Sequence, residues 1–148
     1  MEVQVKSFDA LTVMELYAIL RLRSAVFVVE QACIYQDVDD KDQKALHVIG
    51  SKDGTLVAYT RIFAAGDYFK ESSIGRVVVA DSERQHGYGR DIMIASINAI
   101  DAHFKTKTIH VSAQTYLQKF YNSLGFEQVG APYLEDGLPH MGMLKRGS

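Results

Sequence analysis

Two hydrophobic periods follow one another along the whole chain. Short apolar or alternating runs favour strands, whereas apolar residues repeated every three or four positions favour helices. Strands are predicted at residues 3–8, 45–50, 55–63, 74–79, 109–114, 126–129 and 139–145. Helices are predicted at about residues 12–29, 90–104 and 116–124. The chain is therefore expected to mix strands and helices throughout its length.

Local signals mark several ends of these elements. Thr12, with Glu15 three residues later, forms a capping-box pattern at the start of the first helix. Residues 52–54, Lys-Asp-Gly, are typical of a hairpin turn, and residues 135–137 predict a second turn. Gly125 is placed to end the third helix in a left-handed conformation.

The stretch from residue 74 to residue 90 is the most distinctive part of the sequence. An apolar, β-branched run leads into polar residues, then Gly87 and Gly89, then the second helix. The first amides of a helix lack partners and carry partial positive charge, and glycine lets a ligand approach the backbone. This combination suits a phosphate group, to which Arg84 and Arg90 could add charged donors. The alternative is an ordinary strand-to-helix turn that uses glycine for its geometry.

Length and charge narrow the classes of function. The 148 residues are enough for one domain with its own core, assigned to residues 1–146, with residues 147–148 as a tail or cloning remnant. The net charge is −2 without a block of basic residues, which argues against nucleic acid as a partner. No apolar run is long enough to span a membrane, and the N-terminus lacks the apolar core of a signal peptide.

Cys33 is the only cysteine, which excludes an internal disulfide and favours a cytoplasmic location. It is either a structural thiol or a nucleophile. The five histidines show no metal-ligand spacing, so no metal is expected. Neither a P-loop nor a Gly-x-Ser-x-Gly nucleophile motif is present.

The acidic segment at residues 37–42 has the composition of a loop. It is either a solvated loop or a wall of an acceptor pocket that attracts a cation. His47 and Arg61 interrupt otherwise apolar strands. Each is either a satisfied group at the edge of the core or a pocket group.

Two motifs lie one after the other along the chain. They are Val77-x-Val79 followed by Arg84-x-x-Gly87-x-Gly89 at a helix start, and Phe120-Tyr121-x-x-x-Gly125-Phe126 downstream of a strand. At this spacing they resemble the GNAT superfamily of N-acetyltransferases, the first its acetyl-CoA motif and the second its Tyr-x-x-x-Gly-Phe segment. The resemblance covers essentially the whole chain.

A closer resemblance is to the ElaA-like subgroup of this superfamily. It is carried by residues 22–31, His47, 74–77, 113–114 and 135–140. Three positions depart from the pattern. Ile34 stands where a proline is usual, Asp40 where a glycine is usual, and Gln85 where many members have a glycine.

The resemblance implies an α/β (α+β) fold of the GNAT type. Such a fold has a central mixed, mostly antiparallel twisted sheet of six to seven strands, flanked by about four helices. A splayed parallel pair of strands forms the acetyl-CoA slot. Here the two strands would be those at residues 74–79 and 109–114.

The resemblance also implies which residues bind acetyl-CoA. Val77 and Val79 would offer backbone groups to the pantetheine arm, and a backbone N–H near them would polarise the thioester carbonyl. The turn at residues 84–90 would hold the pyrophosphate. The full set of expected cofactor-binding residues is Val77, Val78, Val79, Arg84, Gln85, His86, Gly87, Tyr88, Gly89, Arg90 and Gln114.

Tyr121 matches the family's usual general acid, which protonates the departing CoA thiolate; the alternative is a core tyrosine. The general base, which an amine acceptor requires, is left open. His47 and His140 are candidates because the intrinsic pKa range of histidine suits a base near neutral pH, and Glu30 or Asp39 could act through a water molecule. No sequence argument ranks these candidates, and the alternative for each is a structural role or a place in an acceptor pocket.

The expected activity is therefore direct transfer of an acetyl group from acetyl-CoA to an amine of a small molecule or peptide, in a ternary complex. One alternative is a non-catalytic CoA-binding or sensing protein on the same fold. Another is a nucleotide-binding module unrelated to CoA. A homodimer is a further expectation, and neither nucleic acid nor a membrane is expected as a partner.

Overall fold

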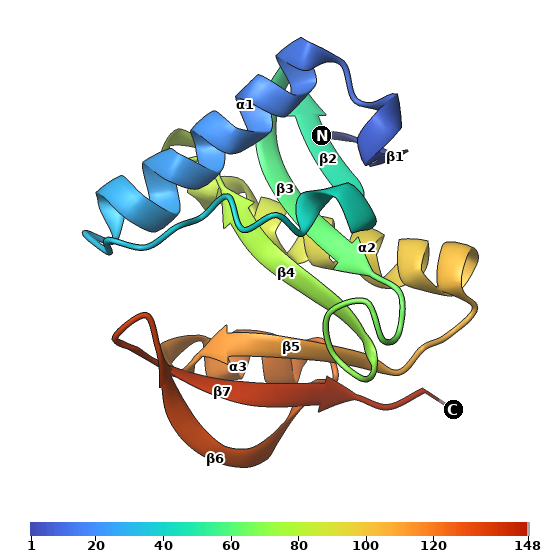
Figure 1. Cartoon of the computed structure of the whole chain (residues 1–148), viewed down its shortest axis with the longest axis vertical. Coiled ribbons are helices and arrows are strands. Elements are labelled where there is room, and N and C mark those ends of the chain that lie inside the picture. Colours follow the sequence, from blue (N-terminus) through green and yellow to red (C-terminus); the bar gives the residue numbers. More distant parts are fainter. Residues whose placement is uncertain (148) are drawn as a thin grey trace.

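Seven strands form one sheet in this computed structural model, which describes residues 1–147 (Figure 1). In chain order they are β1 Glu2–Ser7, β2 Leu46–Lys52, β3 Thr55–Phe63, β4 Ser72–Val79, β5 Ile109–Gln114, β6 Glu127–Glu135 and β7 Leu138–Lys145. Their order across the sheet is β1-β2-β3-β4-β5-β7-β6. Only the β4–β5 pair of this sheet is parallel. The predicted mixed, mostly antiparallel sheet is confirmed. Residue 148, from the predicted tail, lies outside the described residues.

Helices cover both faces of the sheet. The α-helices are α1 Val13–Arg23, α2 Tyr88–Phe104 and α3 Gln118–Ser123, and a π-helical segment, Ser24–Glu30, continues α1. The predicted capping box at the start of α1 is confirmed, because Glu15 N–H donates to the Thr12 hydroxyl and Thr12 N–H donates to the Glu15 carboxylate. The first helix was predicted as one run, and the structure divides it at Arg23 into α and π geometry.

The sheet separates two hydrophobic clusters. In Figure 1, α1 lies in front of β3 and β4, and α2 lies behind them. Because neighbouring side chains in a strand point to opposite faces, Val48 and Ala58 pack in the larger cluster while Ile49 and Tyr59 pack in the smaller one. The larger cluster includes α2, and the smaller one includes Ile19 of α1.

β4 and β5 diverge soon after they begin. Only two residue pairs join them, Ser72 with Ile109 and Ser73 with His110. Beyond these pairs the edge of β4 toward β5 is open, and Figure 1 shows the two strands splayed apart toward their C-terminal ends. The parallel splayed pair predicted from the sequence resemblance is therefore present.

The strand predicted at residues 126–129 is too short. β6 extends through Glu135, with a register shift against β7 between Val129 and Tyr133. Nearly every residue of β6 is exposed, so no alternation of apolar and polar residues marks its second half. Gly125 has a φ of 94°, which confirms its predicted left-handed conformation at the end of α3.

Candidate functional site

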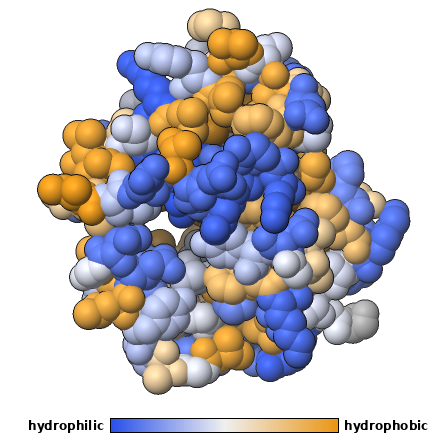
Figure 2. Space-filling view, viewed as in Figure 1, coloured by the Kyte–Doolittle hydropathy of each residue, from blue (hydrophilic) through white to orange (hydrophobic). Residues whose placement is uncertain are grey.

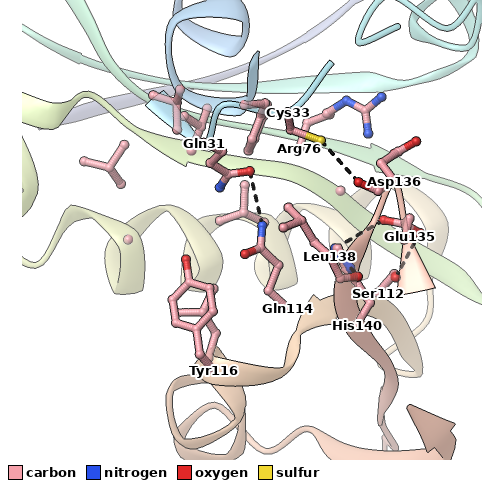
Figure 3. A pocket seen from close by; sticks show the side chains of 18 of the residues that line it. Gln31, Cys33, Arg76, Ser112, Gln114, Tyr116, Glu135, Asp136, Leu138 and His140 are labelled. Atoms are coloured by element: carbon pink, nitrogen blue, oxygen red, sulfur yellow. Dashed lines mark hydrogen bonds and ion pairs between the residues drawn. The ribbon is translucent and has the colours of Figure 1, made fainter. Parts of the chain in front are cut away.

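A cleft of about 440 Å³ lies where β4 and β5 separate. One wall comes from the π-helical segment, the residues just after it and β4, and the other from β5, α3 and the β6–β7 turn. Figure 2 shows the molecule hollowed between its upper and lower halves, with hydrophilic residues above and below the hollow. Figure 3 shows side chains from both walls pointing toward one another across this space.

The open edge of β4 offers backbone groups to the cleft. Ala80 N–H donates to the Val57 carbonyl at 2.8 Å, on the β3 side. Successive residues of an extended strand present their backbone groups to opposite edges, so the N–H and C=O of Val79 face the cleft. Consistent with this, the Val79 carbonyl accepts a hydrogen bond from Arg84 Nε at 3.3 Å. Val77, Val78 and Val79 all line the cleft.

The turn after β4 has the geometry expected of an anion site. A 3-10 helix, Asp81–His86, leads to Gly87, whose φ of 75° is left-handed, and α2 begins at Tyr88. No side chain caps α2, so its first amides have no protein partner among the described residues. A Cβ on Gly87 would meet nothing within 4 Å, which leaves this approach open.

Arg84 lines the cleft but already has a carboxylate partner. Its Nη1 and Nη2 donate to the two oxygens of Glu30 at 2.7 and 3.0 Å. The side chains of Arg84 and Glu30 remain 39% and 40% exposed, so solvent screens this pair. The pairing raises the pKa of Arg84 through the hydrogen bonds that its guanidinium donates to Glu30. Glu30, a candidate base, therefore contacts a cation at the cleft.

Only some of the remaining residues that were expected to bind the cofactor line the cleft. Gly89 and Gln114 line the cleft. The Gln85 side chain is exposed, and His86 lies 3.3 Å from Glu83. Arg90 points elsewhere, because its Nη1 donates to Ser123 Oγ of α3 at 3.3 Å. Tyr88 is half-buried and contributes to the core beneath the turn.

Tyr121 is 5% exposed and lies where α3 borders the cleft. Its ring packs edge-on against Phe120 and Phe126, with centroid distances of 5.2 and 5.9 Å. Burial raises the pKa of the Tyr121 hydroxyl, with a smaller contribution from Tyr116. The hydroxyl thus stays protonated at neutral pH, and no hydrogen-bond partner is present for it among residues 1–147.

His140 lines the other end of the cleft and is 7% exposed. Its Nδ1 lies 2.8 Å from the Leu138 carbonyl, which can only accept, so Nδ1 carries a proton. Its Nε2 lies 3.3 Å from Glu135 Oε2, and the other Glu135 oxygen accepts from Ser112 Oγ at 3.3 Å. Imidazole and carboxylate can therefore share a proton at Nε2.

Two polar contacts cross the cleft between its walls (Figure 3). Gln114 Nε2 donates to Gln31 Oε1 at 3.4 Å, and Cys33 Sγ donates to the Asp136 carbonyl at 3.4 Å. The first is long for an N–H donor, and in the second a thiol is a weak donor. Cys33 is half-buried at the cleft and its thiol binds a backbone carbonyl, which favours a structural role.

His47 is fully buried and does not line the cleft. Its Nε2 donates to the Asp42 carbonyl at 2.9 Å, and its Nδ1 accepts from the Tyr59 hydroxyl at 2.6 Å. Burial lowers the pKa of His47, so the ring is neutral at neutral pH. His47 therefore has no access to the cleft in this geometry, because its side chain is fully buried outside it.

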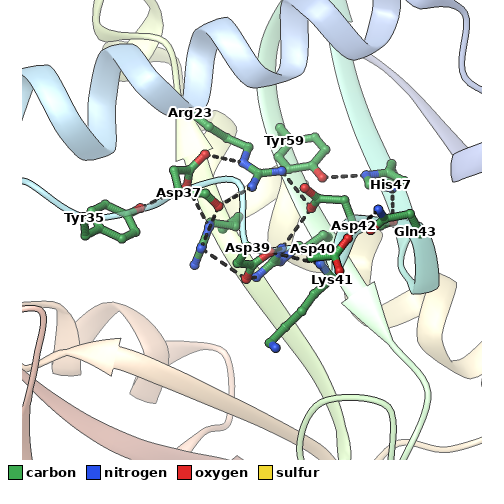
Figure 4. Close-up of polar contacts among 12 residues, drawn as sticks. Arg23, Tyr35, Asp37, Asp39, Asp40, Lys41, Asp42, Gln43, His47 and Tyr59 are labelled. Atoms are coloured by element: carbon green, nitrogen blue, oxygen red, sulfur yellow. Dashed lines mark hydrogen bonds and ion pairs between the residues drawn. The ribbon is translucent and has the colours of Figure 1, made fainter.

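The acidic segment at residues 37–42 is neither a fully solvated loop nor an unpaired acidic wall of an acceptor pocket. Val38, Asp40 and Lys41 are exposed, whereas Asp37 and Asp42 are buried and turn toward Arg23 (Figure 4). Asp37, Asp39 and Asp42 each form ion pairs with buried or half-buried arginines. The three arginines and three aspartates involved, called the charge cluster below, are Arg23, Arg61, Arg76, Asp37, Asp39 and Asp42.

The arginines of this cluster lower the pKa of two of its aspartates. Burial alone would raise the pKa of Asp39, but hydrogen bonds and charge from Arg61 lower it to about 2. Burial opposes the ionisation of Asp42 too, and Arg23 and Arg61 outweigh it, so the pKa of Asp42 is also lowered. Asp39 is thus an ion-pair partner of Arg61, and the sequence-based alternative that made it a base has no support from its position.

Sequence reasoning did not single out several residues that line the cleft. Ser112 and Glu135 bind one another beside His140, and Arg76 and Tyr116 line the walls. One usable signal existed for Ser112, because it alternates with the buried Val111 and Ala113 in β5. Glu135 lay in a predicted turn, where no local pattern distinguishes a cleft carboxylate from a solvated one.

Residues 1–147 contain no group of three or more His, Cys, Asp or Glu side chains placed to hold a metal ion. No helix within these residues is both long and apolar enough to cross a bilayer. Cytoplasmic location and homodimer formation stay predictions.

Comparisons with known proteins agree over most of the chain. The family model for an acetyltransferase (GNAT) domain matches residues 14–146. Protein ElaA of Escherichia coli is 43% identical over 137 residues, 91% of this chain and 90% of that protein. A UPF0039 protein of Schizosaccharomyces pombe is 44% identical over 140 residues, 93% of this chain and 92% of that protein.

Solved structures show the same correspondence. The crystal structure of Escherichia coli ElaA matches with a TM-score of 0.91 at 41% identity. That of an acyl-CoA N-acyltransferase from Pseudomonas aeruginosa matches with a TM-score of 0.91 at 37% identity. Each comparison covers 98% of this chain and 99% of the other.

Proposed function

Because the chain belongs to the GNAT acetyltransferase family, we propose that it transfers an acetyl group from acetyl-CoA directly to an amine of a small molecule or peptide. The observation that carries this proposal is the combination of an open β4 edge and a buried, protonated Tyr121 in one cleft. Backbone donors and a proton donor are the two kinds of group that acyl transfer from a thioester requires.

The residues present fit acetyl-CoA. The free edge at Val77 and Val79 can pair with the amide groups of a pantetheine arm, as a neighbouring strand would. The uncapped start of α2 and Gly87 form a site for the pyrophosphate, and Arg84 supplies a cation at its side. Bound acetyl-CoA would supply the acetyl thioester and a thiolate leaving group.

Each residue then has a defined task. A backbone N–H of the Val77–Val79 stretch donates a hydrogen bond that polarises the thioester carbonyl. This hydrogen bond strengthens as negative charge develops on the carbonyl oxygen. Tyr121 donates its proton to the departing thiolate. Because burial raises the pKa of Tyr121, the proton is present on the hydroxyl at neutral pH.

The pair His140–Glu135 is the proposed base. Its Nε2 faces the cleft-lining carboxylate of Glu135 at 3.3 Å, and the pair can take up the proton that the amine loses. The other candidates have competing roles, since Glu30 binds Arg84 and His47 is enclosed in the core. Glu135 and Asp136 also give this end of the cleft a negative character that suits an amine.

The experiment has two steps. In the first, thermal unfolding is followed with CoA, acetyl-CoA, ATP and NAD. We expect the two CoA species alone to raise the melting temperature, and stabilisation by ATP or NAD instead would indicate a different nucleotide site. In the second, CoA release is measured with acetyl-CoA over a panel of amines, amino acids and peptides. Binding of CoA without release for any acceptor would favour a non-catalytic CoA-binding protein.

Tyr121→Phe tests the acid directly. We expect kcat to fall about a hundredfold or more while acetyl-CoA affinity changes little, because only proton donation is lost. Tyr116→Phe is the matched control, since Tyr116 also lines the cleft but is 74% exposed. Equal turnover of Tyr121→Phe and the native protein would refute the acid role.

A further inference from the structure

Arg76 has an unusual backbone for its place in the fold. Its φ is 51°, in the left-handed region that favours glycine, and it lies inside β4. The other described non-glycine residues with positive φ lie in turns, in loops or at a helix end. A residue with a Cβ holds this conformation only when its surroundings impose it.

This conformation creates a bulge at the mouth of the cleft. β4 pairs with β3 as Tyr59 with Val78 on one side of the irregularity, and as Arg61 with Gly75 on the other. β4 therefore contains one residue more than β3 at this point, as in a β-bulge. Bulges bend a strand and redirect its groups, and here the redirected stretch is Val77–Val79, which lines the cleft.

The Arg76 side chain is tied down at several points. Its Nε lies 2.8 Å from Asp37 Oδ1, and its Nη2 donates to the Asp37 carbonyl at 3.0 Å. A longer contact of 3.4 Å joins Nη2 to Asp39 Oδ2. The guanidinium also stacks over the Tyr35 ring, 5.6 Å from its centroid. A planar group with this many contacts has one orientation.

Asp37 is itself held from the core. Arg23, which is fully buried in α1, donates through Nε to Asp37 Oδ2 at 2.9 Å and through Nη2 to the Asp37 carbonyl at 2.9 Å (Figure 4). Arg23 also donates to Asp42 at 2.8 Å, which Arg61 of β3 shares at 2.8 Å. A continuous chain of ion pairs thus runs from α1 and β3 to the bulge.

We propose that Arg76 is a positioning residue, whose ion pair with Asp37 holds the left-handed backbone that aims the Val77–Val79 groups into the cleft. This inference rests on the proposed function for its catalytic consequence only. A glycine at residue 76 would allow the same φ without fixing it. The arginine fixes it, so the bulge keeps one geometry before any ligand binds.

The test compares Arg76→Gly with Arg76→Ala. Glycine tolerates the left-handed backbone and should fold, but it lacks the tether, whereas alanine lacks the tether and disfavours the backbone. Amide hydrogen exchange of Val78 and Ala80, whose N–H groups face β3, is read first, in the protein without ligands. We expect exchange at these two amides to be at least tenfold faster in both variants, and faster in Arg76→Ala than in Arg76→Gly. The exchange rates of the β2 amides should stay unchanged.

Kinetics provide the second readout. We expect kcat for acetyl transfer to fall about tenfold in Arg76→Gly and further in Arg76→Ala, with KM for the amine little changed. Arg76→Lys should recover part of kcat, because one ammonium can reach Asp37 but cannot reproduce all the contacts. Asp53→Ala is the control for strain alone, since Asp53 has a φ of 52° in the β2–β3 turn. It should lower stability without changing kcat or the exchange at β4.

The outcomes separate the two ideas. Unchanged exchange at Val78 and Ala80 in both glycine and alanine variants would overturn the positioning role, whatever the activity. Quickened exchange with native kcat would overturn its catalytic consequence. If exchange quickens but the native protein transfers no acetyl group, the positioning role stands and the proposed function fails.

Discussion

Two acidic stretches of this molecule, residues 37–42 and residues 135–136, have opposite surroundings. Residues 37–42 place three aspartates against three arginines in a buried cluster with no net charge. Glu135 and Asp136, by contrast, sit at the cleft with no arginine or lysine partner among the described residues. The first stretch fixes the position of a long connection, whereas the second leaves negative charge available to a ligand.

The arginines decide between these roles. A buried guanidinium needs carboxylate partners, because an unpaired buried charge is very costly. Arg23 in an apolar helix face and Arg61 in an apolar strand therefore require acidic partners, and the fold supplies them from residues 37–42. No arginine of the described chain makes such a demand on residues 135–136. An acidic loop is thus interpreted best together with the buried cations near it.

Removing one carboxylate from the cluster should have the largest effect. Asp42→Asn leaves Arg23 and Arg61 without their shared anion, and we expect a loss of about 3–5 kcal/mol in the free energy of unfolding. Urea denaturation measures it. Asp136→Asn is the matched control and should change stability by about 0.5 kcal/mol at most, since Asp136 is exposed. Similar losses in both variants would remove the distinction between the two stretches.

Charge at the cleft turn should affect binding and not folding. Gly87→Asp and Gly87→Asn introduce side chains of equal size at a φ of 75°, which both tolerate comparably. Only the aspartate repels a pyrophosphate, so we expect its acetyl-CoA affinity to be roughly tenfold to a hundredfold weaker than that of the asparagine variant. Isothermal titration calorimetry measures the difference. Equal affinities would place the pyrophosphate elsewhere.

Acid should unfold the protein through its buried groups. The lowered pKa of His47 means that the unfolded chain takes up a proton more readily than the folded one, so stability falls as pH drops below about 6.5. The lowered pKa values of Asp39 and Asp42 add a second loss as pH falls from about 4 through about 2. Urea midpoints measured across this range should show both. His47→Gln should remove the first loss, and its persistence would assign that loss to another group.

The smallest effect concerns the pair at the edge of the cleft. Glu30→Gln frees the Arg84 guanidinium from its carboxylate partner, and we expect acetyl-CoA to bind a few-fold more tightly, with stability changed by about 1 kcal/mol or less. Asp81→Asn is the control, because Asp81 also contacts Arg84 but is 84% exposed outside the cleft. Weaker binding by Glu30→Gln would mean that Glu30 orients Arg84 for the phosphate.

The sequence predicted the fold and the family well because regular features carry both. Hydrophobic periods placed most strands and helices, and the motif around Gly87 placed the β4–α2 turn. The family resemblance is confirmed by the match over residues 14–146. The second half of β6 was missed because an exposed strand carries no apolar pattern.

The site was predictable only on its cofactor side. Tyr121 and the β4 residues belong to local motifs, so their positions follow from the sequence. The acceptor side depends on residues brought together across long separations, such as Cys33 with Asp136 and Ser112 with Glu135. The choice between a core role and a pocket role for His47 depended on such contacts too, since its partners Asp42 and Tyr59 lie on other segments.

The bulge in β6 has a consequence for how copies of this protein meet. β6 is an exposed edge strand, and such strands are templates for aggregation when long and regular. The register shift between Val129 and Tyr133 divides it into two short regular pieces, and Pro132 between them has no N–H to offer. The irregularity therefore prevents another strand from pairing along the full length of β6, one of the two edge strands of the sheet.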